Sequence, residues 1–409
     1  MTETVSPQPL FDPFAPGFTD DPYPHYAAVR ATAPVYQHPF GFWLLTGYED
    51  VSWLLRAGLS VEDRNTRPEG PLQQLRREIF GEDGAVPVGG LSMLDRDPPD
   101  HTRLRKLVSK AFTPRAVEAL RPRITELVDG MLDEMAGQGR VDLVDALAFP
   151  LPFQVIAEML GTPPAGHERI RELSGTVVRS LEPVADPELA KAIVAADTEL
   201  TAIASEMIAW KRRNPAGDLL TALINAEDGG DTLNDDELVA QTLLLYIAGH
   251  ETTVNLISGG TLALLRHPGQ LALLRSDPGL VGNAVEEFLR YDSPVQASRR
   301  VTLEPITVGG VDIPDGSFVM ASLGGANRDP AYWGADADEL RLDRENARQH
   351  VSFGAGVHHC LGASLARLEA TIAFGRMVAR FPGLALDGDV VWNGRINLRG
   401  PAQLPVRLR

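Results

Sequence analysis

The sequence predicts a mainly α fold, with a large helical body and small β-sheet regions near both ends of the chain. Apolar residues recur with helical spacing through nearly every segment from about 100 to 290. Alternating patterns mark three outer stretches, 35–45, 301–320 and 390–408. No internal repeat or low-complexity linker divides the chain. We therefore expect a single domain over residues 1–409, although the length alone would suggest more.

Composition narrows the class of protein. The chain is 44% hydrophobic with 38 glycines and 31 prolines, which is typical of a globular protein with a large core. Its formal net charge of −17 argues against a nucleic-acid partner. The first thirty residues are rich in acids and prolines, so they predict neither a signal peptide nor a membrane anchor. One cysteine cannot form an internal disulfide, which suits a reducing compartment, and we expect a cytoplasmic protein.

The expected elements follow one another without a long linker. In chain order they are helices at 23–33 and 48–57 around strands at 35–45, loops at 60–94, helices from about 100 to 290, hairpins at 301–320 and β segments at 390–408. Proline and glycine interrupt the helical part at 114, 149–152, 161–164, 183–187 and 214–217. The longest apolar helix is expected over about 236–267.

The most distinctive stretch surrounds Cys360, which is the only cysteine of the chain. Residues 353–362 read Phe-Gly-Ala-Gly-Val-His-His-Cys-Leu-Gly, and a helical pattern begins at residue 363. Glycines let the backbone approach a flat ligand closely, and a helix N-terminus stabilises a thiolate. The pattern therefore favours a sulfur-ligated metal centre.

Cys360 has two alternatives to metal ligation. A buried small hydrophobe is common for a lone cysteine, but it needs no flanking glycines. A nucleophile with a histidine base is the other. His358 and His359 are adjacent to it in sequence, whereas such a base normally comes from a distant segment. Metal ligation is the preferred interpretation.

The motif Phe-Gly-x-Gly-x-His-x-Cys-x-Gly at 353–362 resembles the haem-ligating loop of the cytochrome P450 family at all six fixed positions. The resemblance covers nearly the whole chain and implies the cytochrome P450 fold. It also implies haem b as cofactor, with the Cys360 thiolate as the ligand of the iron. Phe353, Gly354, His358 and Gly362 are then expected to contact the haem.

A polar stretch interrupts the longest apolar helix, where residues 248–253 read Ala-Gly-His-Glu-Thr-Thr. A buried carboxylate or hydroxyl is costly unless it is satisfied, and a threonine hydroxyl can bond back to the preceding turn and bend the helix. One interpretation is a packed structural helix, and the other is an acid–alcohol pair that relays protons. The stretch resembles the oxygen-activation signature of the family, which implies that Glu251 and Thr252 are catalytic and that Ala248 lies against the haem.

Four residues that can carry a positive charge or donate a hydrogen bond are candidates for binding the haem propionates. His101 and Arg105 are four apart and so share one face of a helix. A solvated helix face is the commoner explanation of such a pair, but the resemblance implies a propionate contact. The resemblance assigns a second propionate contact to Arg300, with Arg299 as the second choice. His358 is the last of the propionate-binding candidates.

The segment 100–123 is locally basic. It holds seven Lys or Arg residues against Asp100 and Glu118, a balance of 7 − 2 = +5 in a chain of −17. Such a run is usually a solvated face, but it can also steer an acidic partner. The resemblance favours docking of a ferredoxin.

Glu287 and Arg290 have the spacing of an ion pair on one helix face. The spacing alone carries little information, because it recurs at several other places and most such pairs lie on the surface. The order of motifs in the family implies that this pair fastens the cysteine loop. The third member of the network is open, with Arg341 or Arg344 as candidates.

The substrate is predicted only in outline. Pocket walls are expected at 60–94, where a glycine-rich part at 81–90 leaves room, and at about 165–190. The expected lining residues are Met93, Leu244, Leu245, Ala248, Val295, Gln296, Ala297 and Ile396. Few charged groups occur in these stretches, so we expect a bulky, mostly apolar or amphipathic substrate. The resemblance is to actinobacterial members that tailor macrolides and other polyketides.

The resulting hypothesis is a monomeric monooxygenase that hydroxylates or epoxidises such a molecule with O2. Electrons would come from NAD(P)H through ferredoxin reductase and ferredoxin, because no flavin or nucleotide motif is found in the chain. The alternatives are a peroxide-driven or ring-coupling enzyme and a non-catalytic haem-binding or scaffold protein. An intact Glu251-Thr252 pair argues against the last.

Overall fold

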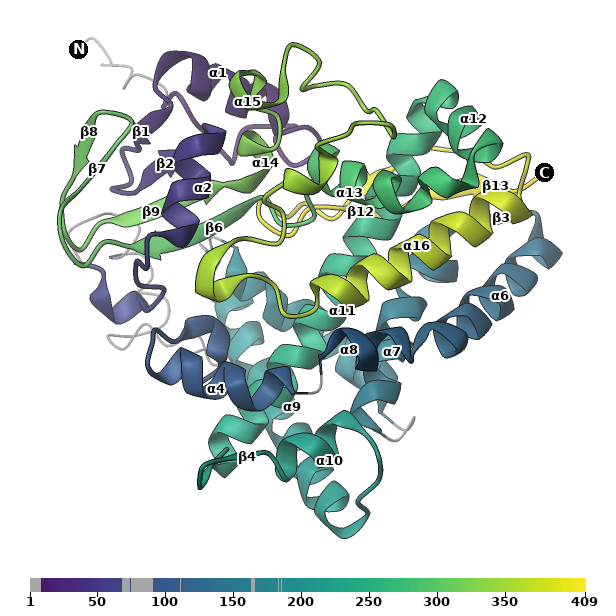
Figure 1. The fold of residues 1–409 in the computed structure, drawn as a ribbon, viewed down its shortest axis with the longest axis horizontal. Helices are drawn as coiled ribbons and strands as arrows, with labels where there is room; N and C mark the ends of the chain where they lie inside the picture. Colours follow the sequence, from purple (N-terminus) through teal and green to yellow (C-terminus); the bar gives the residue numbers. More distant parts are fainter. Residues whose placement is uncertain are drawn as a thin grey trace.

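The computed structural model describes residues 9–67, 74, 91–110, 112–162, 166–182, 184 and 186–409. Helices form most of the molecule, and a sheet-rich part lies to the left in Figure 1. The α-helices are α1 (Tyr23–Thr32), α2 (Tyr48–Arg56), α4 (Asp100–Ser109), α5 (Pro114–Glu118), α6 (Arg121–Gln138), α7 (Pro150–Leu160), α8 (His167–Val177), α9 (Pro187–Arg213), α10 (Leu219–Ile224), α11 (Asp235–Arg266), α12 (Pro268–Ser276), α13 (Val281–Tyr291), α14 (Leu323–Ala326), α15 (Pro330–Trp333) and α16 (Ala363–Arg380). The mainly helical prediction is confirmed.

The strands are short and form five small sheets in the described part of the chain. They are β1 (Val35–Gln37), β2 (Trp43–Leu45), β3 (Arg140–Asp142), β4 (Glu227–Asp228), β5 (Asp231–Thr232), β6 (Ala297–Val301), β7 (Ile306–Val308), β8 (Val311–Ile313), β9 (Phe318–Ser322), β10 (Ala385–Leu386), β11 (Val391–Trp392), β12 (Pro401–Gln403) and β13 (Pro405–Arg407). The largest sheet has the order β1-β2-β9-β6, with β2 parallel to β9. The first predicted β region and the 301–320 region therefore meet in one sheet.

The prediction of helices throughout 100–290 was wrong at two places. Strand β3 pairs antiparallel with β13, so that Val141 lies opposite Val406. Strands β4 and β5 form a hairpin just before α11. Strands of two or three residues are too short to give an alternating pattern, and β3 finds its partner far along the chain.

Helix α11 is the central element, and its start is specified locally. Asn234 Oδ1 accepts the Glu237 N–H at 2.9 Å, while the Glu237 side chain accepts the Asn234 N–H at 3.0 Å. This reciprocal cap satisfies two backbone donors that the helix leaves free. The helix ends at Arg266, and after one residue, His267, a proline opens α12. It agrees closely with the predicted range of 236–267.

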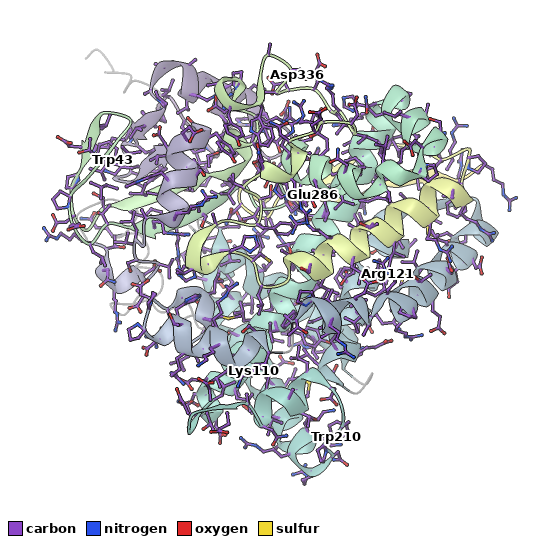
Figure 2. All side chains as sticks on the ribbon, viewed as in Figure 1. Trp43, Lys110, Arg121, Trp210, Glu286 and Asp336 are labelled. Carbon is purple, nitrogen blue, oxygen red and sulfur yellow. The ribbon has the colours of Figure 1, made fainter. Side chains whose placement is uncertain are left out.

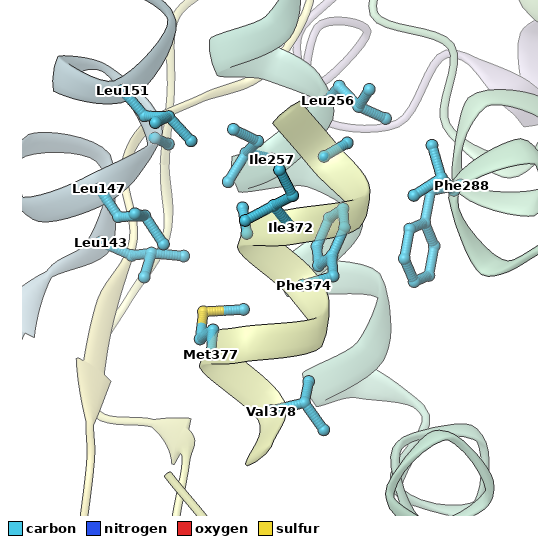
Figure 3. Close-up of a cluster of buried hydrophobic side chains, with 14 of the residues drawn as sticks. Leu143, Leu147, Leu151, Leu256, Ile257, Phe288, Ile372, Phe374, Met377 and Val378 are labelled. Atoms are coloured by element: carbon cyan, nitrogen blue, oxygen red, sulfur yellow. The ribbon is translucent and has the colours of Figure 1, made fainter. Parts of the chain in front are cut away.

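Helix α16, which follows Cys360, packs against α11 and holds the end of the cysteine loop in place. Figure 3 shows Phe374 and Met377 of α16 in one buried cluster with Ile257 of α11 and Phe288 of α13. A Cβ at Gly260 of α11 would lie 2.6 Å from Phe374 Cζ, so the ring fills the space that this glycine leaves. Close packing of this kind makes the relative position of the two helices rigid.

A buried ion-pair network ties α13 to the chain that leads to the cysteine loop. Arg290 Nε donates to Glu287 Oε2 at 2.7 Å and its Nη2 to Glu287 Oε1 at 2.8 Å, and neither side chain is exposed. Arg344 Nε adds a bond of 3.2 Å to Glu287 Oε1. Arg341 contributes only its backbone N–H, at 2.9 Å. Of the two candidates for the third member, Arg344 therefore supplies the side chain.

In the described part of the chain, none of the helices combines the length and the apolarity that crossing a bilayer requires.

Candidate active site

The loop before α16 presents Cys360 by bending sharply twice. The Cys360 N–H donates to Phe353 O at 2.9 Å, which closes the loop at its base. Gly354 and Gly356 have φ of +65° and +69°, a region that favours glycine. A Cβ at Gly356 would lie only 2.6 Å from Leu55 O, so the loop is pressed against the end of α2. The two glycines are thus required by the backbone path, as the motif indicated.

The Cys360 side chain retains accessible surface, and it lines a large cavity. Burial raises the pKa of the Cys360 thiol, whereas the backbone N–H groups of Gly362 and Ala363 and the charges of Arg105 and Arg367 act in the opposite direction. The sulfur therefore has donors and cations arranged around it that favour its thiolate form. It is suited to a positive metal centre.

A second group of charged side chains, centred on Glu286, contacts the cysteine loop through Arg367. Glu286 of α13 accepts Arg367 Nε at 2.7 Å and lies 3.0 Å from His350 Nε2. The Arg367 guanidinium in turn lies 4.5 Å from the centre of the Phe353 ring. Figure 2 shows Glu286 near the middle of the molecule, beside the cysteine loop and α16. Sequence reasoning missed this group, because its members lie on three separate segments.

The four predicted propionate-binding residues converge on the same cavity. His101, Arg105, Arg300 and His358 all line it, and the rings of His101 and His358 have centroids 4.2 Å apart. His101 Nδ1 and His358 Nε2 are buried, and neither has a hydrogen-bond partner among the described residues. A buried polar atom without a partner is costly, and either ring nitrogen can carry a hydrogen, so this group is suited to a ligand with acceptor atoms.

The charges of this group indicate the kind of ligand. Burial lowers the pKa of Arg300 to about 10, with Asp97 opposing the shift. Burial also lowers the pKa of His358 to about 3, assisted by His101, Arg300 and Arg105. Cationic and polar side chains therefore lie together in this part of the cavity wall, with little negative charge nearby to balance them. An anionic group such as a carboxylate would relieve this imbalance, and a haem with its propionates fits the observed donors.

Three of the cationic candidates also have partners within the protein. Arg105 Nη2 donates to His359 O at 2.6 Å, which links α4 to the cysteine loop. Arg299, the second choice for the propionate contact, is held by Asp63 at 3.0 Å and by Asp95 at 3.0 Å. Arg299 is thus already paired, whereas Arg300 donates to Ser298 Oγ and Arg299 O.

Helix α11 contributes the polar stretch 248–253 to the cavity wall. Thr252 Oγ1 donates to Ala248 O at 3.2 Å, which is the backward bond expected for a threonine hydroxyl. A Cβ at Gly249 would lie 3.0 Å from Ile156 Cγ1, so α7 packs closely against this turn. Ala248, Glu251 and Thr252 line the cavity that Cys360 also lines.

Glu251 is held by an ion pair that sequence reasoning missed. Arg395 Nη1 lies 2.7 Å from Glu251 Oε2, and His250 Nε2 lies 3.5 Å from Oε1, at the limit of a hydrogen bond. Burial would raise the pKa of Glu251, but His250 and Arg395 outweigh it and lower the pKa to about 2. Arg395 lies 144 residues further along the chain, so no local spacing could have revealed the pair.

The cavity has a volume of about 1530 Å³. Seven of the eight predicted lining residues are found in its wall: Met93, Leu244, Leu245, Ala248, Val295, Ala297 and Ile396. The prediction was wrong for Gln296, whose buried side chain turns away and donates from Nε2 to Ser293 O at 2.6 Å. Neighbouring residues of an extended chain point to opposite sides. The glycine-rich part predicted at 81–90 lies outside the described residues.

Charged groups are more frequent in the cavity wall than the sequence suggested. The wall includes Glu62, Asp63, Arg64, Asp95, Arg96, Glu182 and Asp236. Glu182 has a specific task, because its carboxylate accepts the N–H groups of Ile396 at 2.7 Å, Asn397 at 3.0 Å and Leu398 at 3.1 Å. One carboxylate thereby holds three successive residues of the opposite wall.

Acids compensate most of the basic segment 100–123. Five of its seven cations take part in ion pairs: Arg103 with Glu237, Lys106 and Lys110 with Asp228, Arg121 with Glu118, and Arg123 with Glu158. Lys110 and Arg121 also lie at separate places in Figure 2. The excess of positive charge is therefore smaller and less continuous than the sequence count indicated.

A single cysteine sulfur that faces a large cavity, beside groups able to donate to carboxylates, fits a protein that binds haem. Comparison with known proteins specifies the family. The family model described as Cytochrome P450 matches residues 186–277 and 279–393. The chain belongs to the cytochrome P450 family, whose members bind haem iron and act as monooxygenases.

Relatives match over nearly the full length. The chain is 43% identical over 417 residues to a vitamin D(3) 25-hydroxylase of Pseudonocardia autotrophica, covering 100% of this chain and 99% of the relative. It is 41% identical over 400 residues to the 6-deoxyerythronolide B hydroxylase of Saccharopolyspora erythraea, covering 96% and 97%. The crystal structure of the myxobacterial cytochrome P450 CYP267B1 in complex with myristic acid is similar with a TM-score of 0.88 and 39% identity, over 97% of this chain and 98% of that one. The predicted fold is confirmed.

Proposed function

We propose that this cytochrome P450 hydroxylates a bulky, mostly apolar small molecule, with macrolides and other polyketides as the substrate class. The observation that carries the proposal is a cavity of about 1530 Å³ that has Cys360 in its wall together with Glu251 and Thr252. The haem and the substrate would share this volume, because the residues that would hold the haem line the same cavity. The names of two relatives, acting on vitamin D3 and on 6-deoxyerythronolide B, support a large substrate.

The residues that would hold the haem line the cavity, and two of them, His101 and His358, have a buried ring nitrogen without a partner among the described residues. Cys360 would bind the iron, and His101, Arg105, Arg300 and His358 would bind the two propionates. Ala248, Gly354 and Gly362 leave room for a flat ring, which Phe353 would contact. When bound, haem supplies oxygen activation, and a thiolate ligand favours cleavage of the O–O bond.

The polar residues of α11 would handle protons. The Thr252 hydroxyl can give its hydrogen toward the cavity instead of to Ala248 O, and Glu251 can restore it from the solvent side. Glu251 is ionised while it is paired with Arg395, so it can carry a proton only in another arrangement. The aliphatic wall would orient the substrate and keep bulk water away from these groups.

Electrons would come from NAD(P)H through ferredoxin reductase and ferredoxin, in the cytoplasm, to a monomeric single-domain enzyme. The side of the cysteine loop and α4 is the proposed docking surface, because it is close to Cys360. An acidic partner would compete with Asp228 for Lys106 and Lys110. Docking should therefore weaken as the salt concentration rises.

The experiment is the optical spectrum of the purified holoprotein, reduced and exposed to carbon monoxide. A strongly red-shifted thiolate-type Soret band is expected, and Cys360→His should abolish it. Compounds that shift the spin state would then be tested for hydroxylation with ferredoxin, its reductase and NADPH. An imidazole-type band in the parent protein, or binding of the large compounds without any oxidised product, would contradict the proposal.

A further inference from the structure

The loop between β11 and β12 forms part of the cavity wall. Ile396, Asn397 and Leu398 of this loop all line the cavity. Glu182 holds their backbone N–H groups on one side, as described above. On the other side the Gln296 N–H donates to Asn397 O at 2.8 Å, and the Ala297 N–H donates to Asn397 Oδ1 at 2.9 Å. A ligand that fills the cavity therefore presses on a defined piece of backbone.

Arg395 directly precedes this wall and reaches α11. Its Nη1 lies 2.7 Å from Glu251 Oε2, and its Nη2 donates to Gly175 O at 3.4 Å. The two side chains are only 15% and 13% exposed, so the pair is largely removed from water. Arg395 and Ile396 are adjacent in the chain. A displacement of the wall is thus transmitted through one peptide bond to the partner of Glu251.

The pair has a chemical consequence for Glu251. A carboxylate that is ion-paired at 2.7 Å holds no proton near neutral pH, in agreement with its lowered pKa of about 2. It cannot deliver a proton until the contact with Arg395 is lengthened. His250 and Arg395 together lower the pKa of Glu251, so movement of Arg395 removes one of the two groups that stabilise the anion and raises that pKa.

We propose that Arg395 is a positioning residue that couples occupancy of the cavity to proton delivery by Glu251. With the cavity empty, Arg395 keeps Glu251 ionised and fixed. When a ligand presses on the wall at Ile396–Leu398, Arg395 withdraws and Glu251 becomes able to carry protons. This inference rests on the proposed function, because it assigns the proton-carrying role to Glu251.

The reaction itself defines the readout. Productive turnover converts R–H, O2, two electrons and two protons to R–OH and water. Without transfer to a substrate, O2 with two electrons and two protons leaves as hydrogen peroxide. Early proton delivery therefore appears as NADPH oxidation and peroxide formation in the absence of substrate.

The test compares the holoenzyme with R395Q, R395K and R179Q, supplied with ferredoxin, its reductase and NADPH and with no substrate. R395Q should raise substrate-free NADPH oxidation and peroxide formation several-fold over the parent. R395K keeps the positive charge, so its rates should be close to the low rates of the parent. R179Q is the matched control, because Arg179 is exposed and lies in the segment just before Glu182. It removes the same charge without touching Glu251 and should behave as the parent.

The double variant R395Q/E251Q separates coupling through Glu251 from a structural effect on the loop. If Arg395 acts through Glu251, the double variant should leak no more than E251Q alone. The inference would be overturned if R395Q still raised substrate-free peroxide formation in the E251Q background. It would also be overturned if R395Q alone left the substrate-free rate of NADPH oxidation unchanged. Spectra of all variants, reduced and exposed to carbon monoxide, distinguish failure of the proposed function from failure of the role of Arg395. A parent without a thiolate-type band contradicts the proposed function, whereas normal bands with an unchanged leak contradict only the role of Arg395.

Discussion

Two buried Glu–Arg pairs of this chain share the same chemistry but differ in what surrounds them. Glu287 is saturated, since both of its oxygens accept from Arg290 and Arg344 adds a further bond of 3.2 Å. Arg290 also donates to the carbonyls of Asn327 and Ala337. The pair of Glu251 and Arg395 has one short contact of 2.7 Å and borders the cavity.

This difference in surroundings makes the Glu287–Arg290 pair permanent and the Glu251–Arg395 pair exchangeable. A fully enclosed carboxylate cannot change partners without leaving a buried guanidinium uncompensated. A carboxylate at the edge of a cavity can exchange its partner for water or for a hydroxyl group. The same type of ion pair therefore stabilises the fold in one place and can take part in turnover in the other.

The largest expected effect concerns the enclosed pair. Glu287→Gln should lower the free energy of unfolding by about 3–5 kcal/mol, because it leaves the buried charges of Arg290 and Arg344 unanswered. Urea denaturation followed by circular dichroism would measure it. The matched control is Glu118→Gln, which breaks an exposed pair with the same spacing and should cause no measurable change. Equal stability of the two variants would contradict the distinction.

The same substitution in the exchangeable pair should affect turnover rather than folding. Glu251→Gln removes the proton-carrying group and should lower the rate of product formation by about 100-fold, the lower end for general acid–base catalysis. The reduced carbon monoxide spectrum should stay that of the parent. Product formation and NADPH consumption, measured together, check the prediction. If Glu251→Gln instead lost the bound haem, Glu251 would have a structural role.

A smaller effect is expected where one carboxylate holds the cavity wall. Glu182→Gln weakens the bonds to the N–H groups of 396–398 and should lower the free energy of unfolding by about 1–2 kcal/mol. Affinity for a compound that changes the spin state of the parent holoprotein should fall as well. Glu206→Gln, at an exposed glutamate of α9, is the control for both measurements. Unchanged affinity in the Glu182 variant would show that the wall does not depend on this contact.

The smallest effect is a pH dependence of the Glu251 pair. The pKa of Glu251 is about 2 in the folded chain, below the value of about 4.3 expected when it is unfolded. The pair's contribution to stability is therefore complete above about pH 4.3 and is lost as the pH falls toward 2. Between pH 7 and 3.5, the stability difference between the parent and Glu251→Gln should shrink by about 1 kcal/mol. A difference that stays constant over this range would mean that the Glu251 pKa is not lowered.

Features encoded within one segment could be predicted from the sequence. The spacing of Glu287 and Arg290 and the glycines around Cys360 each lie within a few residues, so a periodicity or a motif indicates them. Arg344 could be narrowed to one of two candidates, because its place depends on the fold of the following loop. The polar stretch on α11 was likewise visible as an exception within an apolar helix.

Contacts between distant segments could not be predicted. Arg395 and Glu182 reach their partners across 144 and 214 residues, and neither has a local pattern that marks it. Gln296 was misplaced because an extended chain alternates its sides, and a one-residue choice decides between cavity and interior. The acids that compensate the basic segment 100–123 come from residues such as Asp228 and Glu237, which the charge count of one segment does not include.

The parallel pairing of β2 with β9 also bears on how the chain is made. Leu44 lies opposite Met320, so the two strands can join only after the ribosome has synthesised more than three quarters of the protein. Residue 360, still later, must emerge before a haem can meet its thiolate. The N-terminal strands therefore leave the ribosome long before their partner, and their unpaired edges are open to other chains during that time. Slowing elongation or limiting the supply of haem should thus increase aggregation of newly made chains, with no change in the stability of those already folded.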